Sequence, residues 1–289
     1  MGMMNLFICI AGSRYETITK NCSGQWDEDE IRAIRATYYA MVAEADAIVG
    51  QIFTAIENSS YINNTVVFFW SDHGDMTMDH KQFYKETTLE GSARVPLVVA
   101  GPPGIRRGAV QKRVTSLIDL FPTVMDLTGT PHPSGLAGFS LAPDLLEKPG
   151  DMASSSHPDW VLCQAHMDHS NTGQFMIRQN DWKYINYVGY PAQLFNLAKD
   201  PNELQNVANQ NPDMVKQLES ILTSQLDPDS VDKAAKKFDK DSFVTWKNSL
   251  GDKYNSTIGS KAIRWYPMWH TNPDYYLGLI EKWLQDTDN

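Results

Sequence analysis

Two adjacent side chains and a nearby lysine give this chain its clearest chemical signal. Asp72 offers a carboxylate oxygen and His73 an imidazole nitrogen, and Lys85 follows shortly after them. An oxygen and a nitrogen at neighbouring positions can both turn toward one divalent metal ion. An ammonium beside that ion would offset the negative charge that develops on the oxygens of an anionic ester as its bond breaks. The three residues therefore predict metal-assisted chemistry on an anionic ester.

Each of these residues also has an ordinary explanation. An Asp-His pair can simply form a turn that hydrogen-bonds its own backbone, and a dipeptide of this kind is frequently a chance match. By themselves, Asp72 and His73 favour the turn, and Lys85 favours a solvated loop lysine. Lys81 is expected to face solvent. His80 is equally compatible with a role in supporting the site and with an ordinary position in a loop.

The chemistry-bearing segment lies between two predicted strands. Residues 65–70 form a continuous β-branched and aromatic run, which is typical of a strand covered on both faces of a parallel sheet. Residues 71–74 therefore fall at the carboxyl end of that strand, where open α/β sheets place their ligands. A second short strand is predicted at residues 95–100, and a Gly-Pro-Pro-Gly turn closes it.

Helices are predicted on either side of these strands. An Asp-x-x-Glu capping pattern begins at Asp27, and apolar residues then recur at helical spacing, which predicts one long amphipathic helix over residues 28–57. A second helix is predicted over residues 116–127 and stops at Gly129. Pro122 either starts the regular part of that helix or kinks it.

Together these elements predict an α/β fold with two domains. Residues 1–145 are typical of the closing part of a doubly wound, mostly parallel sheet domain that carries the metal ligands and the site lysine. Residues 146–289 are predicted to form a C-terminal subdomain with a small antiparallel sheet and helices. The helices are expected at residues 212–226 and 275–285. The predicted strands are residues 160–166, 174–178, 182–187 and 193–196.

Composition limits the kinds of partner. With 42% apolar and 21% charged residues among 289 positions, the chain is long and apolar enough to bury a sizeable core. The formal net charge of -10 at pH 7 argues against binding nucleic acid or an acidic membrane surface by bulk attraction. An anionic substrate must then be recognised by a local positive site. Because no run of about 18 apolar residues occurs, no membrane span is expected.

Cysteines and glycosylation sequons bear on the cellular compartment. Three cysteines, Cys9, Cys22 and Cys163, are too few for a disulfide framework. Asn-x-Ser/Thr sequons would accept glycans in the secretory route, which favours a lysosomal or secreted protein. The apolar run at residues 6–11 is too short for a signal peptide and no basic residue precedes it. The sequons lie at Asn21, Asn58, Asn63 and Asn255.

The residues around Lys85 resemble a known family. The segment Glu90-Gly91-Ser92-Ala93-Arg94-Val95-Pro96-Leu97 leads directly into the second strand. With Asp72, His73 and Lys85, it resembles the second half of the signature of the sulfatase family, within the alkaline phosphatase superfamily. The resemblance continues in patches to the C-terminus and includes Trp182-Lys183-Tyr184-Ile185. It implies a sulfuric ester hydrolase whose substrate is a sulfate ester, such as a sulfated sugar derived from glycosaminoglycans.

The resemblance assigns roles to individual residues. Asp72 and His73 are similar to two ligands of the active-site divalent ion, which is usually Ca²⁺ in sulfatases, although many sulfatases have Asn where this chain has His73. Lys85 is similar to the catalytic lysine that contacts the sulfate group. Glu90 and Arg94 look like a structural pair that shapes the loop.

His166 ends the first predicted strand of the antiparallel sheet. The counterpart of this strand in the family ends near the substrate cleft, which implies a substrate-binding role for His166. With Met167, Asp168 and His169 it could be mistaken for a zinc motif. Because the preceding residues are predicted to form a strand, we expect no zinc site there.

The nucleophile of the family is missing from this sequence. Sulfatases use a cysteine in a Cys-x-Pro/Ser/Ala-x-Arg motif, which is converted to formylglycine. Cys9 is followed by Ala11, but Arg14 comes one residue too late, and the other two cysteines lack the motif. The chain is therefore expected to be the C-terminal part of a sulfatase, inactive by itself. Its long helix and its first strand would then expose apolar surface.

Two alternatives to a sulfatase stay open. The first is a phosphonate or phosphate ester hydrolase of the same superfamily. The second is a non-catalytic protein that keeps the site only to bind anions.

Overall fold

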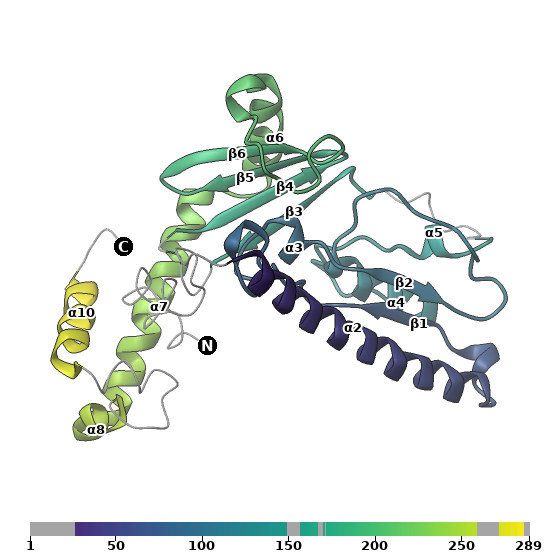
Figure 1. Ribbon diagram of the computed structural model, residues 1–289, viewed down its shortest axis with the longest axis horizontal. Coiled ribbons are helices and arrows are strands. Elements are labelled where there is room, and N and C mark those ends of the chain that lie inside the picture. Colours follow the sequence, from purple (N-terminus) through teal and green to yellow (C-terminus); the bar gives the residue numbers. More distant parts are fainter. Residues whose placement is uncertain (1–26, 149–156, 167–169, 171, 259–271, 286–289) are drawn as a thin grey trace.

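A long helix opens the described part of the chain. The computed structural model describes residues 27–148, 157–166, 170, 172–258 and 272–285. Helix α2 (Glu28–Glu57) leads through a 3-10 turn, η2 (Ile62–Asn64), into strand β1 (Val67–Trp70) (Figure 1). At the start of α2, the Asp27 side chain accepts the Glu30 N–H at 2.8 Å, and the Glu30 carboxylate accepts the Asp27 N–H at 3.1 Å. The predicted helix and its capping pattern are confirmed.

Strand β1 has one described neighbour. It pairs with β2 (Leu97–Ala100), with Val67 opposite Ala100 and Trp70 opposite Leu97. This pairing is antiparallel, whereas the apolar run at residues 65–70 suggested parallel neighbours. The pattern reports only that both faces of a strand are apolar, so it carries no information on the direction of one particular neighbour.

Short helices fill the connections on either side of β2. Between the strands lie η3 (Asp79–Lys81) and α3 (Glu90–Ala93), and after β2 come η4 (Leu117–Asp119), α4 (Leu120–Thr128) and α5 (Ala142–Leu145). Pro122 lies in the first turn of α4, where its missing N–H costs no hydrogen bond, so it helps to start the helix. Gly129 ends α4 in the left-handed conformation, at φ 67°.

A four-stranded antiparallel sheet forms the second half of the fold. Its strands are β3 (Trp160–Ala165), β4 (Gln174–Gln179), β5 (Trp182–Tyr187) and β6 (Tyr190–Asn196), and they lie side by side in that order. After η5 (Ala208–Gln210), helix α6 (Pro212–Gln225) packs on the sheet (Figure 1). The predicted sheet and helix are confirmed, and with them the α/β fold class. The predicted boundary after residue 145 stays a prediction.

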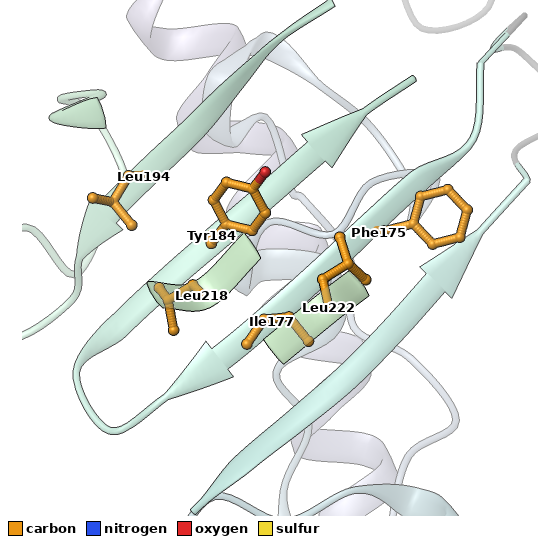
Figure 2. Close-up of a cluster of buried hydrophobic side chains, with 6 residues drawn as sticks. All are labelled: Phe175, Ile177, Tyr184, Leu194, Leu218 and Leu222. Carbon is orange, nitrogen blue, oxygen red and sulfur yellow. The ribbon is translucent and has the colours of Figure 1, made fainter. Parts of the chain in front are cut away.

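Both faces of this sheet are covered. Figure 2 shows one face, where side chains from β4, β5 and β6 meet Leu218 and Leu222 of α6. On the other face, Met76 and Leu89 pack against the sheet. Because both faces of the sheet are covered, the successive apolar residues 175–177 of β4 are all buried. The sheet residues are Phe175, Ile177, Tyr184 and Leu194 toward α6, and Met176, Ile185 and Phe195 toward Met76 and Leu89.

The C-terminal helices form a separate cluster. Helix α7 (Pro228–Leu250) runs from the sheet toward α8 (Tyr254–Ile258) and α10 (Pro273–Gln285), as Figure 1 shows, with η6 (Gly251–Lys253) between α7 and α8. Phe243, Tyr254, Ile258 and Ile280 form their buried core. The predicted helix at residues 275–285 is confirmed.

Helix α2 and the two-stranded sheet expose much apolar surface, as expected. No residue of α2 is buried. Within the described residues, α2 has the length and apolar composition of a membrane-crossing helix. A core helix of a soluble protein meets the same criteria, so the expected absence of a membrane span stays a prediction. The exposed large apolar side chains include Tyr39, Met41, Val42, Ile48 and Ile52 on α2, and Phe69, Trp70 and Val98 on the strands.

Candidate functional site

The segment after β1 forms a tight turn that displays Asp72. The Ser71 hydroxyl donates to the His73 carbonyl oxygen at 2.7 Å, and the His73 N–H donates to Asp72 Oδ1 at 2.9 Å. The turn bonds expected from the ordinary explanation are therefore present. They leave Asp72 Oδ2 at 3.5 Å from His73 Nε2, with 83% of the Asp72 side chain exposed. The same segment can therefore form a hydrogen-bonded turn and still present Asp72 and His73 as a pair of metal ligands.

Lys85 completes the cluster. Its Nζ lies 2.7 Å from His73 Nε2, and His73 Nδ1 lies 2.8 Å from the Gly74 carbonyl oxygen. Because a carbonyl oxygen only accepts, Nδ1 carries the proton and Nε2 accepts from the Lys85 ammonium. The structure therefore brings together the three residues predicted to act on the ester.

The cluster favours the charged form of Asp72. Desolvation acts to raise the pKa of this carboxyl, but the N–H of His73 and the charge of Lys85 together hold the pKa of Asp72 below its usual value. Asp72 therefore carries its negative charge at neutral pH, as a metal ligand must.

Two atoms of the cluster are suited to bind a divalent metal ion. Asp72 supplies a hard carboxylate oxygen, and His73 Nε2 has a lone pair facing the same side. Calcium takes about six to eight oxygen ligands, whereas an imidazole ligand suits zinc, copper, iron or nickel better. Across the part of the chain that the structure covers, no group of three His, Cys, Asp or Glu residues is placed to hold a metal. The pair fits a divalent ion as part of its ligand set.

Backbone and hydroxyl bonds hold Lys85 in place. The Lys85 carbonyl oxygen accepts the Thr87 N–H at 2.7 Å and also the Ser92 hydroxyl. The Gly74 N–H donates to the Ser92 carbonyl oxygen at 2.7 Å. Ser92 of α3 therefore bonds to both sides of the cluster, next to Lys85 and next to His73.

Gly74 is required by a close approach of backbone. A Cβ atom placed on Gly74 would lie 2.1 Å from the Gly91 carbonyl oxygen. Real carbon and oxygen atoms do not approach so closely, and a backbone carbonyl within α3 has little freedom to move. Only glycine therefore allows the turn after β1 to lie against α3.

Glu90 has partners that the sequence did not reveal. Its Oε1 lies 2.6 Å from Lys183 Nζ and 3.4 Å from an Arg178 nitrogen, so it pairs with β5 and β4. Glu90 and Arg94, the predicted structural pair, are joined through the backbone, by a bond from the Arg94 N–H to the Glu90 carbonyl oxygen at 3.0 Å. A lysine between the apolar residues Trp182 and Tyr184 of a predicted strand was the available signal for Lys183.

The predicted substrate residue His166 lies at the end of β3. Its ring packs edge-on against Phe175 at 5.8 Å between centroids, and its Nδ1 lies 3.9 Å from Asp232 of α7. These contacts differ from those of Asp72, His73 and Lys85, and the substrate role of His166 stays a prediction. Residues 167–169 lie outside the described residues.

The loop histidine and Lys81 lie on the surface. His80 is within 3.0 Å of the Asn202 carbonyl oxygen, so it connects the loop before Lys85 to the turn after β6. This contact supports the loop but does not include the cluster itself. Lys81 is exposed, as expected.

Cys163 is unsuited to act as the nucleophile. It is a free, partly buried thiol on β3. Burial raises the pKa of this thiol, and attraction to Lys183 offsets only part of the rise. A thiol with a raised pKa is protonated and inert at neutral pH. Cys9 and Cys22 lie outside the described residues.

A cavity lies elsewhere in the described structure. It measures about 490 Å³ and lies at the turn between β4 and β5, beside α6. Its lining includes Asn180, Trp182 and Gln217 and none of the predicted site residues. The lining also includes Asp159, Asp181 and Lys199 but no imidazole. We assign the candidate site to Asp72, His73 and Lys85, because a carboxylate and an ammonium both lie within 3.5 Å of an imidazole nitrogen there.

Two sequence families match the chain. The family described as Sulfatase matches residues 11–130. The family described as N-sulphoglucosamine sulphohydrolase, C-terminal, matches residues 78–230. Arylsulfatase K of Danio rerio is 44% identical over 277 residues, which cover 95% of this chain and 52% of the relative. The chain thus spans about half the length of the curated relatives it matches.

Two solved structures are similar in fold to this chain. A 2-O glycosaminoglycan sulfatase is 27% identical with a TM-score of 0.63, over 77% of this chain and 48% of that protein. The phosphonate monoester hydrolase of Agrobacterium radiobacter is 31% identical with a TM-score of 0.62, over 69% of this chain and 42% of that protein.

The packing of Gly74 predicts the effect of adding one methyl group there. We expect Gly74→Ala to lower the melting temperature, because the new Cβ cannot fit against Gly91. Gly50→Ala is the matched control, since a Cβ at Gly50 in the exposed α2 meets nothing within 4 Å. This control should raise stability by about 0.5–1 kcal/mol. Thermal denaturation of both variants checks the prediction, and an unchanged Gly74→Ala protein would contradict it.

Proposed function

The chain belongs to the sulfatase family, and from this membership we propose that it forms part of a sulfuric ester hydrolase acting through Asp72, His73 and Lys85. The observation that carries the proposal is the cluster at the end of β1, where Lys85 Nζ and Asp72 Oδ2 lie 2.7 Å and 3.5 Å from His73 Nε2. A carboxylate, an imidazole and an ammonium meet there on a surface open to solvent. This is the donor set that an anionic ester and its metal require.

Asp72 and His73 would hold the divalent ion, which we propose to be Ca²⁺. When bound, the ion would act as a Lewis acid that offsets negative charge on the sulfuryl oxygens. Asp72 enters this role already charged, because its surroundings hold the pKa of its carboxyl below the usual value. The Nδ1 proton of His73, held by the Gly74 carbonyl oxygen, leaves Nε2 as the ring nitrogen that would bind the ion, in exchange for its hydrogen bond from Lys85.

Lys85 would bind and orient the sulfate group. Its ammonium is held beside His73, so its charge lies next to the place where the metal would bind. Because the chain as a whole carries a net charge of -10, recognition of an anion depends on such a local cation. An oriented ammonium stabilises the extra charge that the ester oxygens gain as the bond to the leaving group breaks.

The nucleophile would come from outside this sequence. None of Cys9, Cys22 and Cys163 lies in the motif that yields formylglycine. We therefore propose that formylglycine is supplied by polypeptide that this chain lacks, and that the chain alone binds but does not turn over substrate.

We propose a sulfated sugar as the substrate. The related structure described as a 2-O glycosaminoglycan sulfatase supports a sugar derived from glycosaminoglycans. A phosphonate or phosphate ester is the second candidate, and the 31% identical phosphonate monoester hydrolase favours it. Both are tetrahedral anionic esters, so the same metal and ammonium suit either. Direct comparison of substrates separates the two.

Metal binding can be tested on the chain itself. We expect calorimetry to detect binding of Ca²⁺ or Mn²⁺, and Asp72→Ala and His73→Ala to abolish it, because each variant removes one of the two donors. The matched control is Asp126→Ala, which removes a similar surface pair in which His132 lies 2.8 Å from Asp126. Unchanged metal binding by Asp72→Ala would exclude Asp72 as a ligand.

Turnover can be tested after the missing half is supplied. The chain is fused to the preceding half of Danio rerio arylsulfatase K, and hydrolysis of an aryl sulfate is compared with that of a phenyl phosphonate ester. We expect a preference for the sulfate, and Lys85→Met to lower the rate about 10²- to 10³-fold, as loss of a charge-stabilising donor does. Lys81→Met is the matched control. A fully active Asp72→Ala fusion would refute the proposed function, and a preference for the phosphonate would select the second candidate.

We also propose a lysosomal or secreted location. Three sequon residues, Asn58, Asn63 and Asn255, are exposed and therefore accessible to glycosylation, whereas Asn21 lies outside the described residues. In cells that direct the chain into the secretory route, we expect an endoglycosidase to lower its mass, and Asn58→Gln with Asn63→Gln to reduce that change. An unglycosylated product would contradict the prediction.

A further inference from the structure

A fully buried lysine lies between the antiparallel sheet and the loop of the candidate site. Lys183 projects from β5 into an apolar cluster with 0% of its side chain exposed. Its Nζ lies 2.6 Å from Glu90 Oε1 and 2.9 Å from Glu203 Oε1, and donates to the Thr88 carbonyl oxygen at 3.0 Å. The approach to Glu203 is an ionic contact without the alignment of a hydrogen bond. One ammonium thus contacts three separate points of the surrounding chain.

Its partners also bind each other. The Glu90 N–H donates to Glu203 Oε2 at 2.6 Å, and Arg178 approaches Glu90 from the neighbouring strand at 3.4 Å. Glu203 adopts a left-handed conformation with φ 55°, which is unfavourable for a residue with a side chain. This conformation places its carboxylate where it meets both Lys183 and the start of α3.

The partners of Lys183 are connected to the candidate site through helix α3 and through the loop that contains Lys85. Glu90 is the first residue of α3, and Ser92 of the same helix bonds to the Lys85 carbonyl oxygen and to the Gly74 N–H. Thr88, the third partner of Lys183, lies in the same loop as Lys85. Fixing Glu90 and Thr88 therefore fixes the backbone on both sides of the contact between Lys85 and His73.

We propose that Lys183 is a positioning residue, which sets the contact between Lys85 and His73 by clamping the loop through Glu90. An apolar side chain at this position would hold the sheet and the loop together but would not select one arrangement of the loop. A buried ammonium needs its oxygen partners within contact distance. It therefore stabilises only the one loop position that brings those partners to it. The inference rests on the proposed function only in treating the site as catalytic.

The test measures the NMR signals of the His73 ring and does not require the protein to hydrolyse a substrate. The protein is labelled uniformly with ¹⁵N, and NMR spectra are recorded without added metal. We expect Lys183→Met and Glu90→Gln to shift the His73 ring nitrogens and to speed exchange of the Gly74 amide, because the loop no longer holds Lys85 against Nε2. Lys237→Met is the matched lysine control, since Lys237 pairs with Asp241 on the surface.

A second control separates positioning from general loss of stability. Leu222→Ala removes a buried side chain from the face of the sheet that packs on α6, away from the loop. It should lower stability without shifting the His73 signals. The proposal is overturned if folded Lys183→Met keeps the original His73 and Gly74 signals, or if Leu222→Ala shifts them equally.

Should Lys183→Met fail to fold, Glu90→Gln decides alone, and unshifted His73 signals in that variant also overturn the proposal. An inactive fusion protein would refute the sulfatase function and leave these NMR results unchanged.

Discussion

The buried ammonium of Lys183 is the interaction on which the arrangement of the candidate site depends. Removing one ion from water costs several kcal/mol, and removal of a single partner from a buried pair typically costs about 3–5 kcal/mol. Pairs of this kind add little net stability compared with apolar side chains of similar size. Their effect is on geometry, because Lys183 is satisfied only when Glu90, Glu203 and Thr88 surround it.

The two-faced sheet explains how a distant part of the chain comes to hold the site. Alternation along β5 sends Tyr184 toward α6, and Lys183 and Ile185 toward the loop that contains Met76 and Leu89. A register shift of one residue would exchange these faces and place the ammonium against α6. The apolar contacts on both sides therefore fix the register, and the register in turn directs Lys183 to Glu90.

The candidate site itself is open, in contrast with its buried support. Asp72 has 83% of its side chain exposed, whereas Lys183 has none. The proposed substrate can thus reach Asp72, His73 and Lys85, while Lys183, which we propose to position them, is protected from water. Between Lys183 and the site lie α3 and the close approach of Gly74 to Gly91, which a substrate does not need to displace.

Local patterns in the sequence determined most of the elements and the residues of the cluster. These features depend on residues that are close together in the chain, so their spacing is visible in the sequence. They are helix α2 with its cap, the end of α4 at Gly129, the four antiparallel strands and the trio of Asp72, His73 and Lys85. Only the tertiary structure decided that β1 and β2 pair antiparallel, that the Glu90 carboxylate pairs with Lys183, and that His166 lies against Asp232. Lys183 and Thr88 are 95 positions apart, and no local pattern encodes which of many buried partners such a residue meets. That choice follows from how the whole sheet packs against the loop, since burial and register act through contacts that exist only once the chain has folded.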